Sequence, residues 1–492
     1  MNGPRRFDSV IVANRGEIAA RILRTVKALG LRGLLVAHRV DVNAPALALA
    51  DDVRFIDGAT PVAAFLDGPQ IIAAARDMGA GALHPGYGFL SENAGFARAV
   101  TQAGIVFIGP RAETIDLMGD KIRARNFVAE RGFPVAPSAI EDGDPGNFTA
   151  RARAVGVPLL IKPSAGGGGK GMRIVRDLAN LDEEIIRARS EAQRYFGDGR
   201  LFVERYVERP RHIEVQVLGD AHGNTVHVFE RECSLQRRFQ KIVEEAPAVA
   251  LTPAERQDIC AAAVGIARAA GYLSAGTVEF IYGDGKFYFL EMNTRLQVEH
   301  PVTEAITGID LVAEQLRVAQ GEPLTKTQAE IEATGHAIEL RICAEDSERD
   351  FAPMTGPILR LSAPPEVRFD AGVAVGGAVT PSFDPMIGKL IVHGADRPAA
   401  LAAARAALAR LIIFGVKTNA GYLARLLADG DVAAGALHTG LIAEKTGLFA
   451  DPRPPAAEIA AILAAAALCV PDAVRAAGRV PELHAAIGPW RN

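Results

Sequence analysis

Alternating strand and helix patterns in the first hundred residues limit the fold of this chain more than any other feature. A compact apolar run, "SVIVAN" (9–14), has the length of a buried strand. The next segment, "EIAARILRTVKALG" (17–30), places apolar side chains at helical spacing and ends at a capping glycine, Gly30. Further strands are expected at 33–38, 81–86 and 105–110, and further helices at 68–79 and 92–104. The alternation predicts a doubly wound α/β domain with a parallel sheet.

The turn between the first strand and the first helix excludes one common use of such a domain. A dinucleotide-binding turn needs three glycines in the pattern G-x-G-x-x-G. The segment "ANRGE" (13–17) supplies a single glycine. We therefore reject binding of a nicotinamide dinucleotide.

A glycine-rich segment, "SAGGGGKGMRIV" (164–175), indicates contact with phosphate. Four successive glycines destabilise regular structure, but their bare N–H groups can approach phosphate oxygens closely. Lys170 adds positive charge, and predicted strands flank the loop on both sides. The segment is not a Walker loop, which requires G-x-x-x-x-G-K-[ST] followed by a helix. The alternative is a flexible linker, although a linker rarely joins two apolar strands.

The segment "GTVEFIYGDGKFYFLEMN" (276–293) predicts a β-hairpin that turns through residues 283–285. A two-residue loop at 284–285 would place Glu279 opposite Leu290, and a three-residue loop at 284–286 would place it opposite Glu291. The second register brings two like charges together, which is unfavourable unless a cation lies between them. Two carboxylates and Asn293 suit Mg²⁺ or Mn²⁺, ions that also take phosphate oxygens. Together with the glycine loop, the hairpin predicts a metal–nucleotide complex.

Polar residues continue beyond this hairpin at alternate positions. If the chain stays extended, one face carries the odd-numbered residues Phe287, Phe289, Glu291, Asn293, Arg295, Gln297 and Glu299. Arginine can fix a small oxyanion with two hydrogen bonds, and Glu299 could remove its proton. The segment "CSLQRRFQKIVEEAP" (233–247) adds Lys241. The alternatives are a solvated edge strand, a structural salt bridge and an ordinary exposed run of charges.

Composition limits the class of protein and its partners. The chain has 492 residues, of which 49% are hydrophobic and 23% charged, and its net charge is −4. These values are typical of a soluble protein of roughly three domains, with no nucleic acid or membrane as partner. Four widely spaced cysteines favour reduced thiols in the cytoplasm. The most apolar run (459–470) is too short to cross a membrane, and we expect a packed alanine-rich helix there.

Several motifs together resemble the biotin carboxylases of the ATP-grasp superfamily, from about residue 7 to residue 445. They are "IVANRGEIAARI", "LHPGYGFLSEN", "FIGP", "LMGDK", "SAGGGGKGMRIV", "RHIEVQVLGD", "RECSLQRRFQKIVEEAP", "EMNTRLQVEHPVTE" and "FDPMIGKL". The resemblance implies an α/β chain with a doubly wound N-terminal pre-ATP-grasp domain (1–115) and an ATP-grasp domain (116–330). The ATP-grasp domain would carry a mobile lid at about 135–205. An α+β C-terminal biotin carboxylase domain (331–446) and an Ala/Pro-rich tail (447–492) would follow.

The resemblance also implies an activity. Such an enzyme carboxylates biotin on a carrier protein with ATP and bicarbonate, through carboxyphosphate. This is the first half-reaction of an acyl-CoA carboxylase such as acetyl-, propionyl- or methylcrotonyl-CoA carboxylase. The implied cofactors are ATP, two Mg²⁺ or Mn²⁺ ions and biotin supplied on the carrier. The implied partners are a biotin carboxyl carrier protein or domain, a carboxyltransferase subunit, and a second copy of the chain or a larger complex.

Site residues follow from the resemblance by position. ATP binding is expected at Lys121, Lys162, Gly168, Gly169, Glu204, Arg205, Tyr206, Val207, His212, Glu279 and Glu291. Metal binding is expected at Glu279, Glu291 and Asn293, and bicarbonate binding at Lys241, Arg295, Gln297 and the backbone of Val298. The expected catalytic residues are Arg295, Glu299 as base, Lys241, and Arg341, which would bind biotin and stabilise its enolate. Three positions depart from the family pattern: Arg205 replaces a lysine, Phe239 a histidine and Phe383 a common tyrosine.

Two other functions stay open as alternatives. One is a different ATP-grasp ligase with an amine acceptor, and the other is a catalytically silent nucleotide-binding regulator. The Arg295/Glu299 pair argues against the first, and the intact Glu279, Glu291, Arg295 and Glu299 argue against the second. No lysine lies between two methionines, so biotin is expected on another polypeptide or on a carrier domain that followed the tail.

Overall fold

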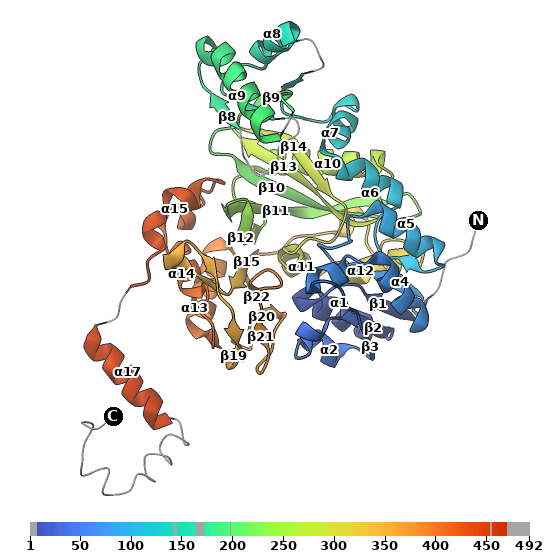
Figure 1. Ribbon diagram of the computed structural model, residues 1–492, viewed down its shortest axis with the longest axis vertical. Helices are drawn as coiled ribbons and strands as arrows, with labels where there is room; N and C mark the ends of the chain where they lie inside the picture. The colour runs from blue at the N-terminus through green and yellow to red at the C-terminus, as the bar shows by residue number, and fades with distance from the viewer. Residues whose placement is uncertain (1–6, 142–144, 164–171, 197, 453–454, 470–492) are drawn as a thin grey trace, which may run out of the picture.

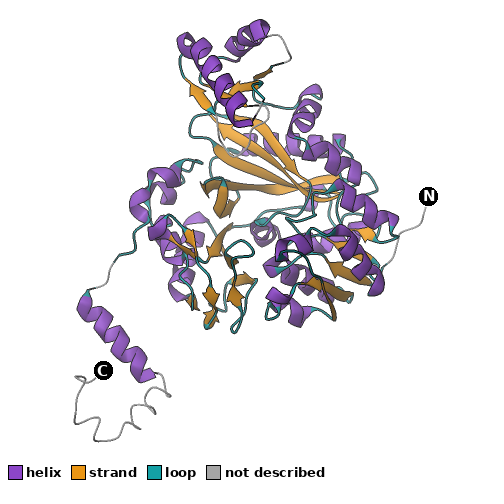
Figure 2. Cartoon of the chain, in the orientation of Figure 1, coloured by secondary structure: helices purple, strands orange, loops and turns teal. Residues whose placement is uncertain are grey.

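A computed structural model describes residues 7–141, 145–163, 172–196, 198–452 and 455–469. The N-terminal part forms the expected doubly wound domain around a parallel sheet with strand order β3-β2-β1-β4-β5 (Figures 1 and 2). Its strands are β1 (Ser9–Val12), β2 (Arg32–Ala37), β3 (Asp52–Phe55), β4 (Ala82–His84) and β5 (Val106–Phe107). Its helices are α1 (Gly16–Ala28), α2 (Pro45–Leu49), α3 (Pro61–Phe65), α4 (Gly68–Asp77) and α5 (Ala94–Gln102).

Alternate residues of β1 explain why helices cover both faces of this sheet. Val10 and Val12 pack in a core with Ile18 and Ile22 of α1. Ile11 points the other way, into a second core with residues of α3, α4 and α5. A strand buried on both faces reads as a continuous apolar run, as "SVIVAN" does.

A smaller unit projects from the upper end of the molecule in Figure 1. Helices α6 (Ala112–Gly119) and α7 (Lys121–Glu130) lead to a four-stranded sheet of order β6-β9-β7-β8. Its elements are β6 (Ser138–Ile140), α8 (Pro145–Val155), β7 (Leu159–Pro163), β8 (Arg173–Val175), α9 (Leu181–Phe196) and β9 (Leu201–Arg205). The antiparallel pair β7–β8 flanks the glycine-rich segment on both sides, as predicted. Gly168 and Gly169 themselves lie outside the described residues.

One eight-stranded antiparallel sheet forms the middle of the molecule. Its order is β14-β13-β10-β11-β12-β15-β22-β20. The strands are β10 (Arg211–Gly219), β11 (Thr225–Arg237), β12 (Gln240–Ala246), β13 (Ser274–Gly283), β14 (Lys286–Asn293), β15 (His336–Cys343), β20 (Arg368–Ala371) and β22 (Met386–Gly394). Because β12 pairs with β15, the sheet continues across residue 330, where the sequence predicts a domain boundary.

Helix α10 (Pro253–Ala269) covers one face of this sheet at β10, and polar residues lie on the opposite face. Ile213 and Val215 of β10 pack against α10 in one core. The alternate residues His212 and Glu214 face the opposite side, with Glu279 of β13 beside them. Two further helices, α11 (His300–Thr307) and α12 (Leu311–Ala319), follow β14.

The remaining elements build the C-terminal part around a core of its own. They are β16 (Glu345–Asp346), β17 (Ala352–Pro353), β18 (Gly356–Pro357), β19 (Arg360–Ser362), β21 (Ala378–Val379), α13 (Arg397–Arg410), β23 (Ile412–Phe414), α14 (Ala420–Leu426), α15 (Gly430–Ala433) and α16 (Leu441–Glu444). Short 3-10 turns lie at Arg39–Asp41, Leu178–Asn180, Gln328–Glu330, Ser347–Arg349 and Thr446–Leu448.

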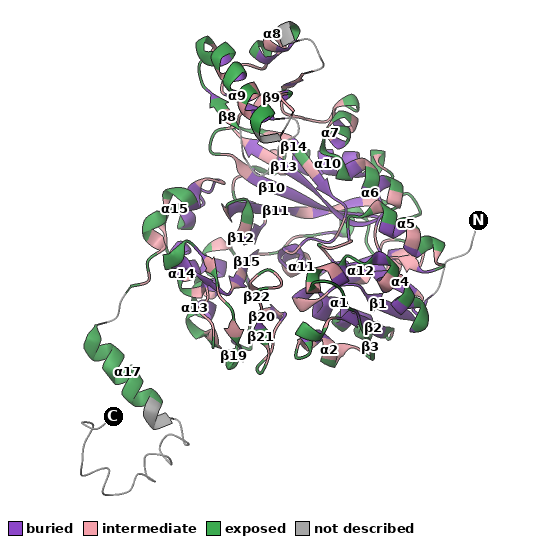
Figure 3. Cartoon of the chain, in the orientation of Figure 1, coloured by how far each residue is buried: buried purple, intermediate pink, exposed green. Residues whose placement is uncertain are grey.

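The alanine-rich run near the end of the chain forms helix α17 (Ala456–Cys469), but the helix is not packed. Every side chain from residue 456 to 466 is exposed, including Ile462 and Leu463 (Figure 3). The prediction of a helix is confirmed and the prediction that it packs is wrong, because its apolar side chains meet no other described element. Within the described residues, no helix is both long and apolar enough to cross a membrane.

Candidate active site

A cavity of about 1750 Å³ opens between the small upper sheet, the eight-stranded sheet and the C-terminal part. Of the predicted site residues within the described chain, it is lined by Lys121, Lys162, Glu204, Arg205, Tyr206, Val207, His212, Lys241, Glu279, Glu291, Asn293, Arg295, Gln297, Val298 and Arg341. Glu299 is fully buried and lies behind the cavity wall instead. The structure therefore brings together residues that are up to 220 positions apart, from Lys121 to Arg341.

Glu279 and Glu291 face each other across the β13–β14 hairpin, as one of the two predicted registers requires. The route to this register differs from the prediction. Asp284 and Gly285 form a two-residue turn with φ of 52° and 68°, as a type I′ turn demands. A β-bulge at Leu290 then shifts the pairing by one residue. The predicted three-residue loop is wrong, since the bulge supplies the extra residue.

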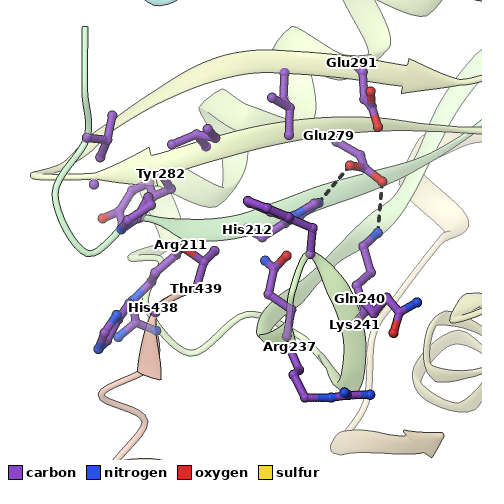
Figure 4. A pocket seen from close by; sticks show the side chains of 18 of the residues that line it. Arg211, His212, Arg237, Gln240, Lys241, Glu279, Tyr282, Glu291, His438 and Thr439 are labelled. Carbon is purple, nitrogen blue, oxygen red and sulfur yellow. Dashed lines mark hydrogen bonds and ion pairs between the residues drawn. The ribbon is translucent and has the colours of Figure 1, made fainter. Parts of the chain in front are cut away.

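The Glu279 carboxylate lies among four polar groups, of which Figure 4 shows His212 and Lys241. Lys241 Nζ and His212 Nε2 are each 2.9 Å from its oxygens. The side-chain amides of Asn293 and Gln297 donate to Oε1, also at 2.9 Å. Burial by itself raises the pKa of Glu279, but the nearby Lys241 and His212 outweigh it and hold the pKa well below its ordinary value.

The opposite carboxylate, Glu291, pairs with Lys121 Nζ at 2.8 Å. Both carboxylates turn toward the same cavity from adjacent strands, so their oxygens fit a divalent cation that also contacts phosphate. The Oδ1 atom of Asn293 accepts a hydrogen bond from Arg295 at 2.9 Å and adds a third oxygen beside them.

Two other groups of side chains place possible metal-ligating atoms within 4.8 Å of one another: His212, Glu214 and Glu279, and Glu214, Cys233 and Glu299. Both include Glu214, which the sequence analysis did not single out. Glu214 lies opposite Glu279 in the β10–β13 ladder. A signal for it exists in "RHIEVQV", because alternation places Glu214 on the same face as His212.

Lys241 occupies the centre of these carboxylates. Its Nζ donates to Glu214 at 2.5 Å, to Glu279 at 2.9 Å and to Glu299 at 2.6 Å. Burial alone lowers the pKa of Lys241, but the three carboxylates together raise it well above its ordinary value. The side chain is therefore a fixed ammonium group at the inner end of the cavity.

Glu299 is held between two cations. Its Oε1 accepts from Lys241, and its Oε2 accepts from Arg341 at 3.0 Å. Burial raises the pKa of Glu299, yet Lys241, Arg341 and Arg231 together lower it far below its ordinary value. Glu299 is thus ionised, which is the form a base requires.

The predicted extended face ends earlier than the sequence analysis expected. Strand β14 stops at Asn293, and Arg295, Gln297 and Glu299 lie in the loop that leads into α11. They still meet at one site because Arg295 contacts Asn293 and Gln297 contacts Glu279. The loop, not strand alternation, brings them together.

Arg295 is oriented by a residue that the sequence analysis missed. Its Nε donates to Glu92 Oε2 at 2.8 Å, from the segment before α5 of the N-terminal domain. Burial lowers the pKa of Arg295, but Glu92, Glu299 and Glu279 together raise it above its ordinary value. Glu92 gives no signal in the sequence, because the two residues are 203 positions apart.

Arg341 has a similar second partner. Its Nε donates to Glu244 Oε1 at 2.6 Å, while its other branch contacts Glu299. Glu244 is fully buried and lies opposite Glu339 in the β12–β15 ladder. Burial raises the pKa of Glu244 to about 7, although Arg341 lowers it.

The far end of the cavity is formed by the upper sheet. Lys162 of β7 and Glu204 of β9 form an ion pair there. Phe239 stands at the tip of the β11–β12 hairpin with φ of 66°, and 77% of its surface is exposed. Phe383 instead packs against Phe65 and Phe89 of the N-terminal domain.

Comparison with known families gives three matches along the chain. Residues 6–115 match the N-terminal domain of biotin carboxylase, and residues 339–444 match the biotin carboxylase C-terminal domain. Residues 120–327 match the ATP-binding domain of the carbamoyl-phosphate synthase L chain.

Individual relatives are similar over most of the chain. Biotin carboxylase of Haemophilus influenzae is 46% identical over 448 residues, which cover 90% of this chain and 99% of the relative. The mitochondrial methylcrotonoyl-CoA carboxylase subunit alpha of Rattus norvegicus is 46% identical over 444 residues, which cover 88% of this chain and 61% of that subunit. A solved structure is also similar: the biotin carboxylase domain dimer of Hydrogenobacter thermophilus 2-oxoglutarate carboxylase, with MgADP, ADP and bicarbonate. It has 42% identity and a TM-score of 0.83, and the match covers 91% of this chain and 99% of that one.

Proposed function

The chain belongs to the biotin carboxylase family, and on that premise we propose how its residues carry out the ATP- and bicarbonate-dependent carboxylation of biotin. One observation supports the assignment above the others. Glu299 is held as a carboxylate between Lys241 and Arg341, at the end of the cavity where Glu279 and Glu291 converge. Two cations and a metal-type carboxylate pair therefore line one cavity, and the base lies directly behind its wall in contact with both cations.

Nucleotide binds along the side of the cavity next to the upper sheet. Lys121 and Lys162 contact its phosphates and adenine, and the segment 204–207 lines the adenine pocket. Glu279 and Glu291, with Asn293, are the residues that would hold Mg²⁺ or Mn²⁺, whose charge neutralises the phosphate oxygens.

Bicarbonate binds at the inner end of the cavity. The guanidinium of Arg295 and the Lys241 ammonium offset its charge, while Gln297 and the Val298 N–H fix its orientation. Glu299 takes the bicarbonate proton. The low pKa of Glu299 rises as the bound anion competes for Lys241 and Arg341, because those cations are what hold it down.

The reaction then balances in two stages. A bicarbonate oxygen attacks the γ-phosphorus, the bond to the ADP oxygen breaks, and carboxyphosphate forms. Carboxyphosphate breaks down to CO₂ and phosphate, and phosphate takes the N1′ proton of biotin. Arg341 stabilises the resulting enolate, which attacks CO₂ through N1′ and gives carboxybiotin.

The partners follow from the same premise. Biotin reaches the cavity on a carrier protein or domain, and a carboxyltransferase subunit uses the carboxybiotin formed. The dimer named for the Hydrogenobacter thermophilus structure supports pairing of two copies of this chain. We place the enzyme in the cytoplasm, where its cysteines stay reduced.

The test is ADP release from Mg·ATP by the purified chain, first with and without bicarbonate and then with free biotin. Release that requires bicarbonate and increases with biotin is the expected result. Absence of ADP release would favour a silent regulator, and release that is indifferent to both, or stimulated by an amine, would favour another ligase. The variant Arg295→Ala should lose the bicarbonate-dependent part, and its full retention would overturn the assignment of the anion site.

A further inference from the structure

A lysine from the C-terminal part of the chain lies fully buried behind the proposed bicarbonate site. Lys389 of β22 has no exposed surface, and lysine is almost never buried to that extent without a partner. In the β15–β22 ladder it lies directly opposite Arg341. Two like charges in this position destabilise a sheet, so a compensating role is needed to explain why both are present.

The contacts of Lys389 connect it to the loop that carries the base. Its Nζ donates to the backbone oxygen of Val298 at 2.7 Å. The same Nζ lies 3.0 Å from Glu17 Oε1, in the first turn of α1. Glu17 in turn accepts a hydrogen bond from the hydroxyl of Tyr87, whose ring lines the cavity.

The position of the Val298 oxygen makes this contact important for the site. That oxygen belongs to the peptide unit that joins Val298 to Glu299, while the Val298 N–H belongs to the preceding unit. A hydrogen bond to this oxygen therefore fixes the backbone of Val298, which carries the proposed anion-binding N–H and directly precedes the base, Glu299. A shift of about 1 Å in such a group can change a rate by about 100-fold.

We propose that Lys389 is a positioning residue for the bicarbonate-binding backbone, and that Glu17 holds Lys389 in place and links it to Tyr87 at the cavity wall. This inference rests on the proposed function. Lys389 touches no reacting atom and acts through the peptide of Val298. Its contact with Glu17 also joins the C-terminal part to the N-terminal domain.

The competing explanation is that Lys389 only stabilises the fold as a buried ion pair. Lys389→Met separates the two explanations when it is compared with Arg256→Met. Arg256 pairs with the fully buried Glu230 at 2.6 Å but does not line the cavity, so its loss removes a buried ion pair elsewhere. Both variants should unfold at a lower temperature than the wild type.

Lys389→Met should raise KM for bicarbonate more than about tenfold and leave KM for ATP within about twofold, whereas Arg256→Met should change neither. An unchanged KM for bicarbonate in Lys389→Met would overturn the inference. Should Lys389→Met fail to fold, Glu17→Gln takes its place. That substitution keeps a hydrogen-bond acceptor at position 17 but removes the charge, so we expect a smaller increase in KM for bicarbonate. No increase would again overturn the inference.

A second measurement does not depend on activity. Hydrogen–deuterium exchange of the peptide covering residues 294–300 should be faster in Lys389→Met than in the wild type and unchanged in Arg256→Met. If exchange is faster in Lys389→Met but ADP release by the wild type does not depend on bicarbonate, the proposed function is overturned while the positioning role of Lys389 is supported. Unchanged exchange would overturn the positioning role itself.

Discussion

Glu279 and Glu291 face each other across one hairpin, and each carboxylate is matched by a lysine from a different element. Lys241 of β12 lies 2.9 Å from Glu279, and Lys121 at the start of α7 lies 2.8 Å from Glu291. Lys121 is largely exposed, so it can move away from Glu291 at little cost. Each carboxylate of the pair thus has a lysine partner, and Glu291 remains accessible to a divalent ion.

Similar like-charge pairs recur in the eight-stranded sheet next to the cavity. Glu214 lies opposite Glu279, Glu244 lies opposite Glu339, and Arg341 lies opposite Lys389. Each pair disfavours the ladder on its own. Their concentration at one place indicates that the sheet is built to hold a charged substrate rather than for maximal stability.

Glu291→Gln should raise the Mg²⁺ concentration needed for half-maximal ADP release by about tenfold or more, because it removes one charged ligand. The measurement is bicarbonate-dependent ADP release at increasing Mg²⁺ and fixed ATP. Glu183→Gln is the matched control, since Glu183 lies on the surface of α9 in an ion pair with Arg187. An equal Mg²⁺ dependence in both variants would remove Glu291 from the proposed metal site.

Glu299→Gln should reduce bicarbonate-dependent ADP release by about 100- to 10 000-fold, since glutamine cannot take the proton of bicarbonate. Nucleotide binding should be unaffected, because Glu299 does not line the cavity. The check is single-turnover ADP formation, with the Kd for ADP measured in parallel as the control. A variant that keeps its turnover would show that another group is the base.

Phe239→His should lower KM for ATP by about two- to tenfold, the effect of one added hydrogen bond. The backbone favours the change, because histidine adopts positive φ more readily than phenylalanine, and the side chain is exposed at the cavity rim. Leu359→His is the control, since Leu359 is also exposed but lies away from the cavity. No change in KM for ATP in Phe239→His would mean that position 239 does not contact nucleotide.

The sequence predicted those parts of the fold that depend on local pattern. The four strands and three helices expected before residue 110 follow apolar spacing, whereas α2, β3 and α3, which are short, were not predicted. The pairing of Glu279 with Glu291 follows from one hairpin. The bulge at Leu290 could not be predicted, because nothing in the hairpin sequence distinguishes a bulge from a longer loop. The exposure of α17 was also missed, since apolar composition alone does not say whether a helix has a neighbour.

The partners of the charged residues were the least predictable part of the site. Glu92 contacts Arg295 over 203 positions, Glu244 contacts Arg341 over 97, and Lys389 contacts the Val298 backbone over 91. Such contacts arise when segments far apart in the chain meet in the folded protein, and no local spacing records them. The resemblance to a family identified the charged groups that we propose to meet substrate, but not the residues that hold them.

Protein stability should fall between pH 6.5 and pH 4 partly because of His84. This side chain is fully buried, with its Nε2 3.2 Å from Gln315 Oε1 and its Nδ1 accepting from the Gly86 N–H at 3.0 Å. Burial lowers the pKa of His84 to about 4. The histidine takes up a proton near pH 6.5 in the unfolded chain but not in the folded protein. The free energy of unfolding therefore falls by about 3 kcal/mol as the pH falls from 6.5 to 4.

His84→Gln should remove this part of the pH dependence in urea unfolding measured from pH 7 to pH 4. His222→Gln, at an exposed histidine, should retain the wild-type dependence and serves as the control. If the free energy of unfolding of His84→Gln depends on pH as steeply as that of the wild type, the buried imidazole does not cause the pH dependence.

Glu339→Gln should make the protein more stable at neutral pH than the wild type. Glu339 is fully buried, and neither carboxylate oxygen has a hydrogen-bond partner among the described residues. Burial raises the pKa of Glu339 well above its ordinary value; Lys389 opposes this and the facing Glu244 adds to it. The unfolded chain releases the proton near pH 4.5 while the folded protein keeps it, so wild-type stability falls as the pH rises above 4.5.

Glutamine at position 339 does not titrate, so the variant does not lose stability in this way as the pH rises. The free energy of unfolding of Glu339→Gln should therefore exceed that of the wild type by a margin that widens by about 1 kcal/mol or more from pH 4.5 to pH 7. Glu444→Gln, at an exposed glutamate, should show no such widening. If Glu339→Gln is instead less stable at pH 7, then Glu339 is ionised and forms an ion pair with Lys389. In that case two carboxylates, Glu17 and Glu339, balance the charge of Lys389, rather than Glu17 alone.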